Sequence, residues 1–200
     1  MKILSTSFLL IAASFFSFGQ EFAFEYWHEG KIVLEKGDTL RGNIKYDLQN
    51  DLVQYQIPNS IETFTTRKVL MFDIFDETVK RYRQFYSLPF AGVTQYKALM
   101  FFELLEEGKL TLLCRESLEY RSSSSAFYYY GSYSRLVIIY RYFIMNEKGE
   151  INEFNGKRKD WLDIMGKQAG EVQKYAKVNR LNFEEKYDLT RIVEYYNSLF

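Results

Sequence analysis

The feature that most constrains the fold of this chain is a change in hydrophobic periodicity near residue 155. Up to that point, short apolar segments follow one another and are separated by turn residues, as in a series of β-strands. From Lys159 onward, apolar residues recur every three or four positions, which is the spacing of an amphipathic helix. The sequence therefore predicts an α+β protein, with a β-rich region over 20–155 and a helical region over 156–200 of the same domain.

The β-rich region is expected to form eight or nine strands. They are expected among ten apolar or alternating segments, which cover residues 32–34, 39–46, 52–57, 63–67 (the weakest), 69–75, 78–88, 99–105, 110–114 or 110–118, 136–145 and 150–154. Most are joined by short turns, and short connections favour antiparallel neighbours. We therefore expect a curved antiparallel sheet or a partly open barrel, in which Gly42 marks a bulge or a close backbone approach.

Three of these segments, 69–75, 99–105 and 136–145, are almost continuously apolar. A strand with one face in water would alternate, so both faces of these three are expected to be covered. The C-terminal region supplies a cover, with expected helices at 159–166 and 168–179 and a last helix with its N-cap at Asn182. The apolar stripe of the last helix, which should pack on the sheet, consists of Leu189, Ile192, Val193, Tyr196 and Leu199.

The N-terminus carries the pattern of an export signal. Met1-Lys2 gives a positive start, residues 3–18 are almost entirely apolar, and Ser17 and Gly19 place small residues just before Gln20. The apolar run is shorter than the roughly 20 residues that span a bilayer, which favours a cleaved signal peptide at 1–19 over an anchor. The mature chain is expected to have no transmembrane span and to lie in the periplasm, on the outer-membrane surface or outside the cell.

The charge balance argues against nucleic acid as a partner. The full chain has 26 Lys and Arg against 26 Asp and Glu, and loss of Lys2 with the signal leaves 25 against 26. This balance gives no long-range attraction to a polyanion, and the cluster Lys157-Arg158-Lys159 is better interpreted as a solvated helix start. The sequence has neither of the glycine-rich phosphate-binding patterns, and no cofactor is expected.

No catalytic or metal-binding pattern stands out in the sequence. His28 is the only histidine, has no second ligand at metal spacing, and is expected to cap a hairpin or face solvent. Cys114 is the only cysteine, and its apolar neighbours favour a buried small side chain over a reactive thiol. The neighbouring carboxylates Asp160 and Asp163 suit the first turn of a helix, where negative charge is favourable.

A stretch rich in Ser, Gly and Tyr at 122–134 is the one candidate binding element. Tyrosine in such a loop offers a large contact area at low entropic cost, as in binding loops. The alternative interpretation is an insertion between strands without a binding role. The candidate binding residues are Tyr128, Tyr129, Tyr130 and Tyr133.

Five segments, at 27–34, 37–46, 83–89, 101–105 and 194–199, are spread over most of the mature chain. Together they resemble an uncharacterised exported protein family of Gram-negative, gliding-type bacteria. The resemblance implies a location in the cell envelope. Because no known activity is attached to that family, it implies no functional residues.

These observations favour a non-catalytic binding or assembly accessory of the cell envelope, with an envelope protein or polymer as its partner. Two alternatives stay open. One is a hydrolase that acts on envelope or environmental polymers through a pair of carboxylates. The other is a carrier that holds an apolar ligand within the aromatic-rich sheet.

Overall fold

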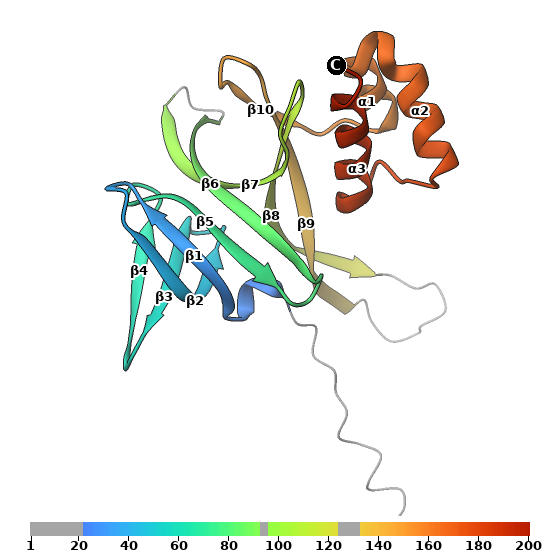
Figure 1. The fold of residues 1–200 in the computed structure, drawn as a ribbon. Helices are drawn as coiled ribbons and strands as arrows, with labels where there is room; N and C mark the ends of the chain where they lie inside the picture. Colours follow the sequence, from blue (N-terminus) through green and yellow to red (C-terminus); the bar gives the residue numbers. More distant parts are fainter. Residues whose placement is uncertain (1–21, 93–95, 124–132) are drawn as a thin grey trace, which may run out of the picture.

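The structure is a computed structural model that describes residues 22–92, 96–123 and 133–200. Within these residues, one antiparallel sheet runs in the order β10-β9-β8-β7-β6-β5-β1-β2-β3-β4, and Figure 1 shows that it is curved and not closed. The strands are β1 (His28–Leu34), β2 (Thr39–Asp47), β3 (Leu52–Ile57), β4 (Ser60–Thr65), β5 (Val69–Asp76), β6 (Arg81–Ala91), β7 (Lys97–Glu106), β8 (Thr111–Ser123), β9 (Tyr133–Met145) and β10 (Ile151–Phe154). The helices are α1 (Arg158–Met165), α2 (Ala169–Val178) and α3 (Lys186–Asn197), with short 3-10 turns at Ala23–Glu25 and Gly166–Gln168.

The expected curved antiparallel sheet followed by C-terminal helices is confirmed, but the described residues form ten strands rather than eight or nine. The weakest segment of the sequence is a full strand, because β4 pairs with β3 over its whole length. The turn between them is only two residues long, Pro58-Asn59, and Asn59 adopts a φ of 66°. Asparagine tolerates this left-handed conformation, so the sequence suits a tight reversal here.

The connection between β4 and β5 explains why the sheet curls. β5 pairs with β1, so β4 and β5 are four positions apart in the strand order. Four strand spacings measure about 19 Å in a flat sheet, whereas the chain from Thr65 to Val69 reaches only about 14 Å when fully extended. The edge strand must therefore curve back towards β5 and β6. A hydrogen bond of 2.8 Å from the Ser87 hydroxyl to the Thr66 carbonyl oxygen fastens this connection.

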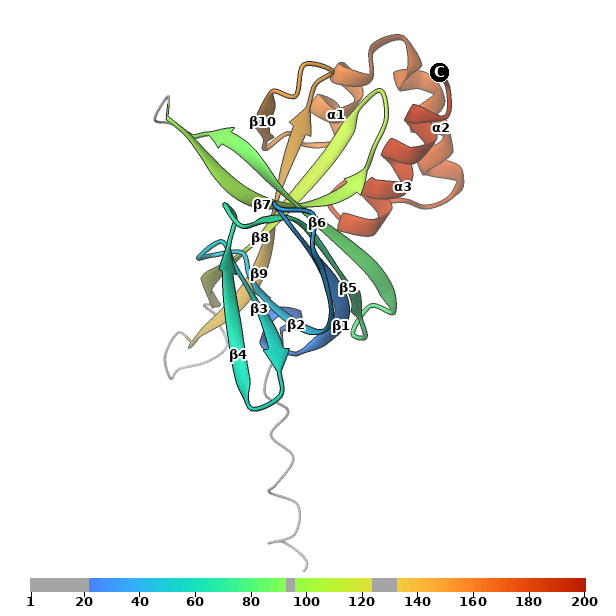
Figure 2. The same ribbon diagram turned by 60° about the vertical axis from the view of Figure 1, so that its left-hand side comes forward.

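Figure 2 shows the curl formed by β1–β5, and an aromatic and aliphatic core is buried among these strands, β6 and β7. Phe72 and Phe85 stack with ring centroids 4.5 Å apart, and Phe101 meets Phe72 edge-on at 5.2 Å. The other buried members are Ile32, Ile44, Tyr46, Leu48, Val53, Val69 and Ile74. These residues alternate along their strands, as a one-sided core requires.

The three helices form a helical cap (158–197) that packs on the other end of the sheet, beside β7–β9. Its buried residues join Leu110 of the β7–β8 turn and Leu112 of β8 in one cluster: Trp161, Met165, Val172, Ala176, Phe183, Leu189, Ile192, Val193 and Tyr196. Four of the five residues expected in the apolar stripe are among them, and Leu199 packs against the same cluster. None of the helices in the described part of the chain has the length and apolar character needed to cross a membrane.

β7 and β8 separate after a short paired section, and the β2–β3 turn fills the gap. Their pairing is confined to 103–106 and 112–114, beyond which β8 continues with β9 alone. Asp51 in the turn accepts hydrogen bonds from the Phe101 amide at 2.8 Å and from Arg115 Nη1 at 2.7 Å. Arg115 also donates to the carbonyl oxygens of Phe101, at 2.5 Å, and of Leu48. The turn thus satisfies backbone groups that a neighbouring strand would otherwise pair.

Two expectations about this region are wrong. The first is that both faces of the three continuously apolar strands are covered. In β7, three consecutive residues at 101–103 are buried, so both faces are covered there. In the other two strands one face is partly open to solvent, since Leu70 of β5 is 49% exposed and Tyr140 of β9 is 40% exposed. The reason is that the helical cap covers only one end of the long strands. Asn182 is also not the N-cap of α3. Its side chain accepts the Glu184 amide within a separate turn, and the helix begins four residues later at Lys186.

Candidate ligand-binding site

A cluster of buried charged side chains joins the sheet to the helical cap. We call Asp76, Arg83, Glu103, Glu116 and Lys186 the charge cluster. Arg83 binds Glu103 in bidentate fashion, with Nε–Oε1 at 2.9 Å and Nη2–Oε2 at 2.7 Å. It also contacts Asp76 Oδ2 at 2.9 Å and Glu116 Oε1. Lys186, the first residue of α3, places its Nζ 2.7 Å from Glu103 Oε2, so α3 is tied to β7 by an ion pair.

The charge cluster is buried and its hydrogen bonds are well matched. Arg83, Glu103 and Lys186 side chains are each 3% exposed. The Tyr46 hydroxyl donates to Glu116 Oε2 at 2.9 Å and accepts from Arg83 Nη1 at 2.9 Å. A buried charge without partners is very costly, so a network in which each charge is bonded fixes the positions of its members. With Tyr46 of β2 included, five strands and one helix are thereby held in one arrangement.

The pKa directions in the charge cluster reflect this pairing. Burial opposes ionisation of Glu103, but Arg83 and Lys186 outweigh it and hold the pKa of the carboxyl below its ordinary value. Burial likewise opposes ionisation of Asp76, and hydrogen bonds from Thr78 and Arg83 leave its pKa lowered. Burial also opposes the charged form of Lys186, yet Glu103 raises the pKa of the ammonium above its ordinary value.

These shifts predict the pH dependence of stability. A carboxyl with a lowered folded-state pKa stabilises the fold above its unfolded value of about 4 and loses this contribution as the pH falls towards the folded value. An ammonium with a raised pKa contributes fully below about pH 10 and loses the contribution at higher pH. We therefore expect urea midpoints to be flat between about pH 5.5 and 9.5 and to fall on both sides. In Glu103→Gln the fall below pH 5 should be shallower, and an unchanged acid slope would contradict the assignment.

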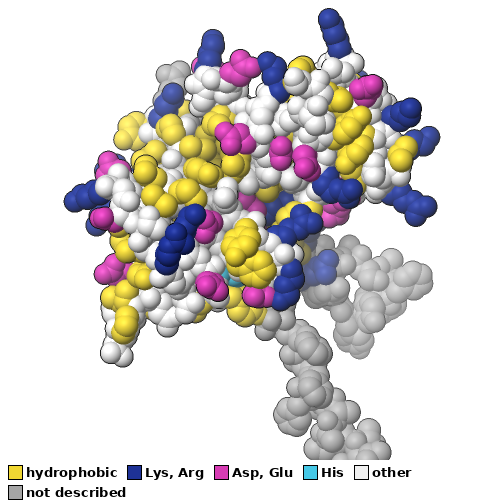
Figure 3. Space-filling view, viewed as in Figure 1, with side chains coloured by type: hydrophobic (Ala, Val, Ile, Leu, Met, Phe, Trp, Pro, Cys, Tyr) yellow, Lys and Arg dark blue, Asp and Glu magenta, His cyan; other side chains and the backbone are white. Residues whose placement is uncertain are grey.

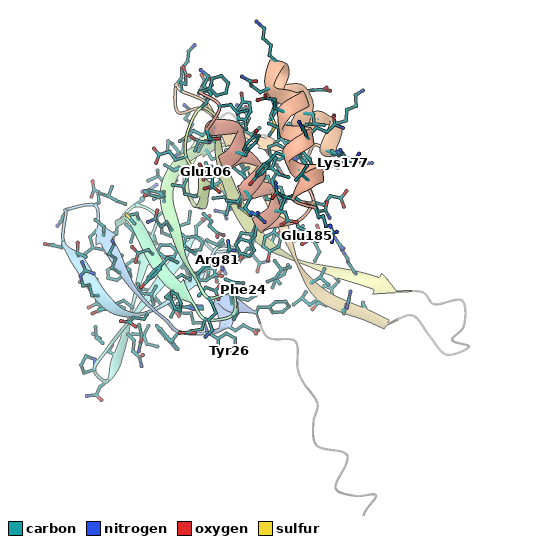
Figure 4. The ribbon with its side chains drawn as sticks, turned by 45° about the vertical axis from the view of Figure 1, so that its right-hand side comes forward. Phe24, Tyr26, Arg81, Glu106, Lys177 and Glu185 are labelled. Carbon is teal, nitrogen blue, oxygen red and sulfur yellow. The ribbon has the colours of Figure 1, made fainter. Side chains whose placement is uncertain are left out.

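A second feature of the same junction is an aromatic pocket of about 240 Å³ between β9 and the helical cap. Its aromatic walls are Tyr140, Tyr142, Phe154, Trp161 and Phe183. The remaining lining residues are Asn155, Gly156, Lys157, Arg158 and Glu184, from the β10–α1 connection, the first residue of α1 and the α2–α3 connection. Figure 4 shows Glu185, beside this lining, at the start of α3, whereas Lys177 projects from α2 on the outer side of the cap.

The walls of the aromatic pocket are held by packing between α1 of the cap and strands β9 and β10. Trp161 is almost fully buried, with its ring centroid 4.2 Å from that of Phe154 and 6.3 Å from that of Tyr142. Gly156 is required for this arrangement, because a Cβ at that position would overlap the Phe154 ring and the Asp160 side chain. Packing of this kind fixes the positions of the aromatic side chains around the pocket.

One polar atom of the pocket residues stands out. The Tyr142 hydroxyl is buried and has no hydrogen-bond partner in the part of the chain that the structure describes. Burial raises the pKa of this phenol, so it stays protonated and able to donate. Leaving a buried hydroxyl unpaired costs about 1–3 kcal/mol. Because this hydroxyl has almost no accessible surface, its cost is carried within the packed junction between β9 and the cap.

The exposed side of the pocket carries two cations. Lys157 and Arg158 are exposed, as expected for a solvated helix start, and neither forms an ion pair with a described residue. The Arg158 guanidinium lies 5.8 Å from the centroid of the Phe183 ring. The nearby Asp160 carboxylate is engaged as a cap, because it accepts the Lys157 amide at 2.7 Å. Other Lys and Arg side chains are spread over the outer surface of the cap (Figure 3).

A second, smaller cavity lies between the end of β2, β8 and the N-terminal 3-10 turn. It measures about 100 Å³ and is lined by Phe24, Tyr46, Asp47, Leu48, Gln49, Glu116, Ser117 and Leu118. Both carboxylates in it have structural partners: Glu116 belongs to the charge cluster, and Asp47 accepts the Gln49 and Asn50 amides at 2.9 and 3.0 Å. Because a cavity of about 150 Å³ is known to take benzene, this one is too small for a sugar ring.

The residues that the sequence singled out have mixed outcomes. Tyr128, Tyr129 and Tyr130 lie outside the described residues, as do the proposed signal peptide and the side chain of Tyr133, whose backbone begins β9. The expectation of a buried Cys114 is confirmed, and burial raises the pKa of its thiol. The interpretation of His28 is wrong: it is 3% exposed and its Nε2 lies 2.7 Å from the Ala23 carbonyl oxygen.

The aromatic pocket was missed by the sequence reasoning because its walls come from four separate segments. A partial signal was available: Phe154 and Trp161 flank the basic cluster at 157–159. Among the described residues, no group of three or more His, Cys, Asp or Glu side chains is placed to hold a metal ion. Comparison of the chain with models of protein families, with curated proteins and with solved structures gave no match.

Proposed function

We propose that this chain is an exported, non-catalytic binding accessory of the cell envelope, and that the aromatic pocket is its ligand site. The observation that carries the proposal is the convergence of five aromatic side chains on one preformed cavity of about 240 Å³. Concave sites with apolar walls and a few polar groups are typical of ligand binding. The signal-like N-terminal sequence supports a location outside the cytoplasm.

The acidic groups of the charge cluster and of the aromatic pocket support a binding role there rather than hydrolysis. Hydrolysis of polymers by two carboxylates requires a pair that faces the same substrate. In the charge cluster, Glu103 and Glu116 instead share the two cations Arg83 and Lys186 as ion-pair partners. Glu184 is the one carboxylate among the residues that line the aromatic pocket. The site thus offers aromatic surface and hydrogen bonds without a second acid–base group.

Co-sedimentation with insoluble envelope polysaccharide tests this proposal. The exported form of the full chain is mixed with the polymer fraction, and the bound share is measured for Tyr140→Ala and for Tyr120→Ala. Tyr140 lines the aromatic pocket, whereas Tyr120 is 76% exposed on β8 and does not line it. Loss of an aromatic contact of about 1.5–3 kcal/mol should weaken binding at least tenfold in the first variant only. Equal binding by both variants and the unaltered chain would contradict the proposed site.

The tyrosine-rich loop remains a separate prediction. Removal of residues 122–134 should leave the aromatic pocket unchanged, since none of its described lining residues lies in that stretch. If the loop supplies the binding residues, as its composition suggests, the shortened chain should lose capture of the polymer while Tyr140→Ala retains it. The reverse pattern supports the pocket, so the same assay separates the two sites.

A further inference from the structure

We infer that β4, the strand at one end of the sheet, pairs with β4 of a second copy of this chain to form an antiparallel dimer. The inference goes beyond the proposed function and does not depend on what the aromatic pocket binds. Three properties of β4 lead to it: its outer edge is open, its outward backbone groups match those of a second copy, and its side chains suit a pairing centred on Thr63.

The outer edge of β4 is open to solvent. Within the described residues its one strand partner is β3, and five of its six residues are exposed. Figure 1 and Figure 2 show that the β3–β4 hairpin projects from the rest of the sheet, so a second strand can lie along this edge. Open edges are commonly protected by a lysine, a proline or a bulge within the strand. The sequence of β4, Ser-Ile-Glu-Thr-Phe-Thr, and its unshifted register with β3 provide none of these.

The turn between β3 and β4 determines which backbone groups point outward. Ile57 and Ser60 flank a two-residue turn and therefore form a hydrogen-bonded pair. Along an antiparallel strand the backbone groups point alternately to one side and to the other, so every second residue from Ser60 bonds to β3. The amide and carbonyl groups point away from β3 at the residues between: Ile61, Thr63 and Thr65.

A two-fold axis through Thr63 pairs these outward groups. The Thr63 residues of the two copies then lie opposite each other and exchange both of their N–H···O bonds. The Thr65 amide of each copy donates to the Ile61 carbonyl oxygen of the other. The Thr65 carbonyl oxygen already accepts the Lys68 amide within the chain, at 3.0 Å. The dimer thus supplies partners for backbone groups that only water can bond in the isolated chain.

The side chains of β4 favour this register and a second copy as the partner. Glu62 is the one charged residue of the strand, and the axis places it opposite Phe64 of the other copy rather than opposite a second Glu62. Thr63 lies opposite Thr63, and threonine pairs of this kind stabilise sheets. An axis through Ile61 or Thr65 would place part of each strand beyond the bounds of the other, so fewer residues would pair.

The interface consists of one strand from each copy, so it is small and belongs with the weak associations. We expect a dissociation constant in the range of about 10 µM to 1 mM. Sedimentation velocity of the exported form of the full chain should therefore show monomers at the lower limit and dimers at the upper limit.

Charges placed at the axis test the pairing. Thr63→Lys and Thr63→Glu each set two like charges opposite one another, so either variant alone should stay monomeric over this range. An equimolar mixture of the two should dimerise at least as well as the unaltered chain, because opposite charges then face each other. Thr63 is exposed, so neither change alters the core. Thr39→Lys and Thr39→Glu, at an exposed position of β2, are the matched controls and should dimerise like the unaltered chain, alone and mixed.

Thr63→Pro gives a second readout that does not depend on charge. It removes an N–H that points away from β3, and proline is tolerated at such positions of edge strands. The variant should keep the circular dichroism spectrum of the folded chain and lose the dimer.

Three results would overturn the inference. A chain that stays monomeric up to about 1 mM leaves this edge to a strand of another protein or to none. A dimer that persists in both single-charge variants of Thr63 has a different interface. A dimer that is lost in both of them and is not restored in their mixture does not have its axis at Thr63.

Discussion

Replacing Arg83 with methionine is expected to lower the free energy of unfolding by about 3–5 kcal/mol, because it leaves buried carboxylates without their main counter-ion. Methionine keeps the apolar stem, so the change isolates the guanidinium. Lys186 would remain as the single cation near Glu103 and Glu116. Urea unfolding at pH 7 measures the effect.

Two further variants make the Arg83 prediction specific. Arg121→Met, at an exposed position on β8, should change stability by less than about 0.5 kcal/mol. Arg83→Lys keeps one charge but loses the two-bond contact with Glu103, and its stability should lie between those of the methionine variant and the unaltered chain. If Arg83→Met is as stable as Arg121→Met, the charge cluster does not hold the sheet and the cap together.

Replacing Leu189 with alanine is expected to cost about 2–5 kcal/mol, the range for large-to-small changes at fully buried positions. Leu189 is completely buried on α3 and belongs to the cluster that joins the cap to Leu110 and Leu112. Val178→Ala on α2 is the control, since Val178 is 73% exposed and its shortening should have little effect. Thermal unfolding followed by circular dichroism gives both values. A loss below about 1 kcal/mol for Leu189→Ala would mean that the cap is not part of the stable core.

Much of the fold was predictable because local sequence patterns indicate which segments are strands, turns and helices. The strand segments, the short turns and the helical spacing after Lys159 follow from periodicity, and periodicity reflects which face of an element is buried. What periodicity could not show was the curl, which depends on the short β4–β5 connection and on the position of β5 beside β1. Strand order is a long-range property, so no local window contains it.

The charge cluster shows a different limit. Glu103 lies between apolar residues in β7, and a carboxylate in such a place needs a partner. Its partners Arg83 and Lys186 are 20 and 83 residues away in the sequence. The sequence therefore indicates that Glu103 needs a cationic partner, but not which residues supply it. Arg141 lies in an equally apolar strand, yet its side chain is 54% exposed, and its Nε lies 3.8 Å from Glu153 Oε1. A charge within an apolar run therefore does not by itself reveal whether it is buried.

The aromatic pocket could not be predicted for a related reason. Tyr142, Phe154, Trp161 and Phe183 each look like ordinary core residues in their own segments. They form a cavity because Gly156 lets the β10–α1 connection approach closely and because α3 is tied to β7 through Lys186. The site is a product of how the cap meets the sheet.

Native-state hydrogen exchange tests that junction most directly. If the helical cap and the sheet fold as one unit, the slowest amides of α3, at Ile192 and Val193, should exchange with the same free energy as those of β8 at Leu112 and Leu113. Both sets should also lose protection at the same urea concentration. The contradicting result is an opening free energy for the α3 amides that is several kcal/mol lower than the opening free energy for the β8 amides. It would show that the cap detaches while the sheet stays folded, so the pocket between them would not be preformed.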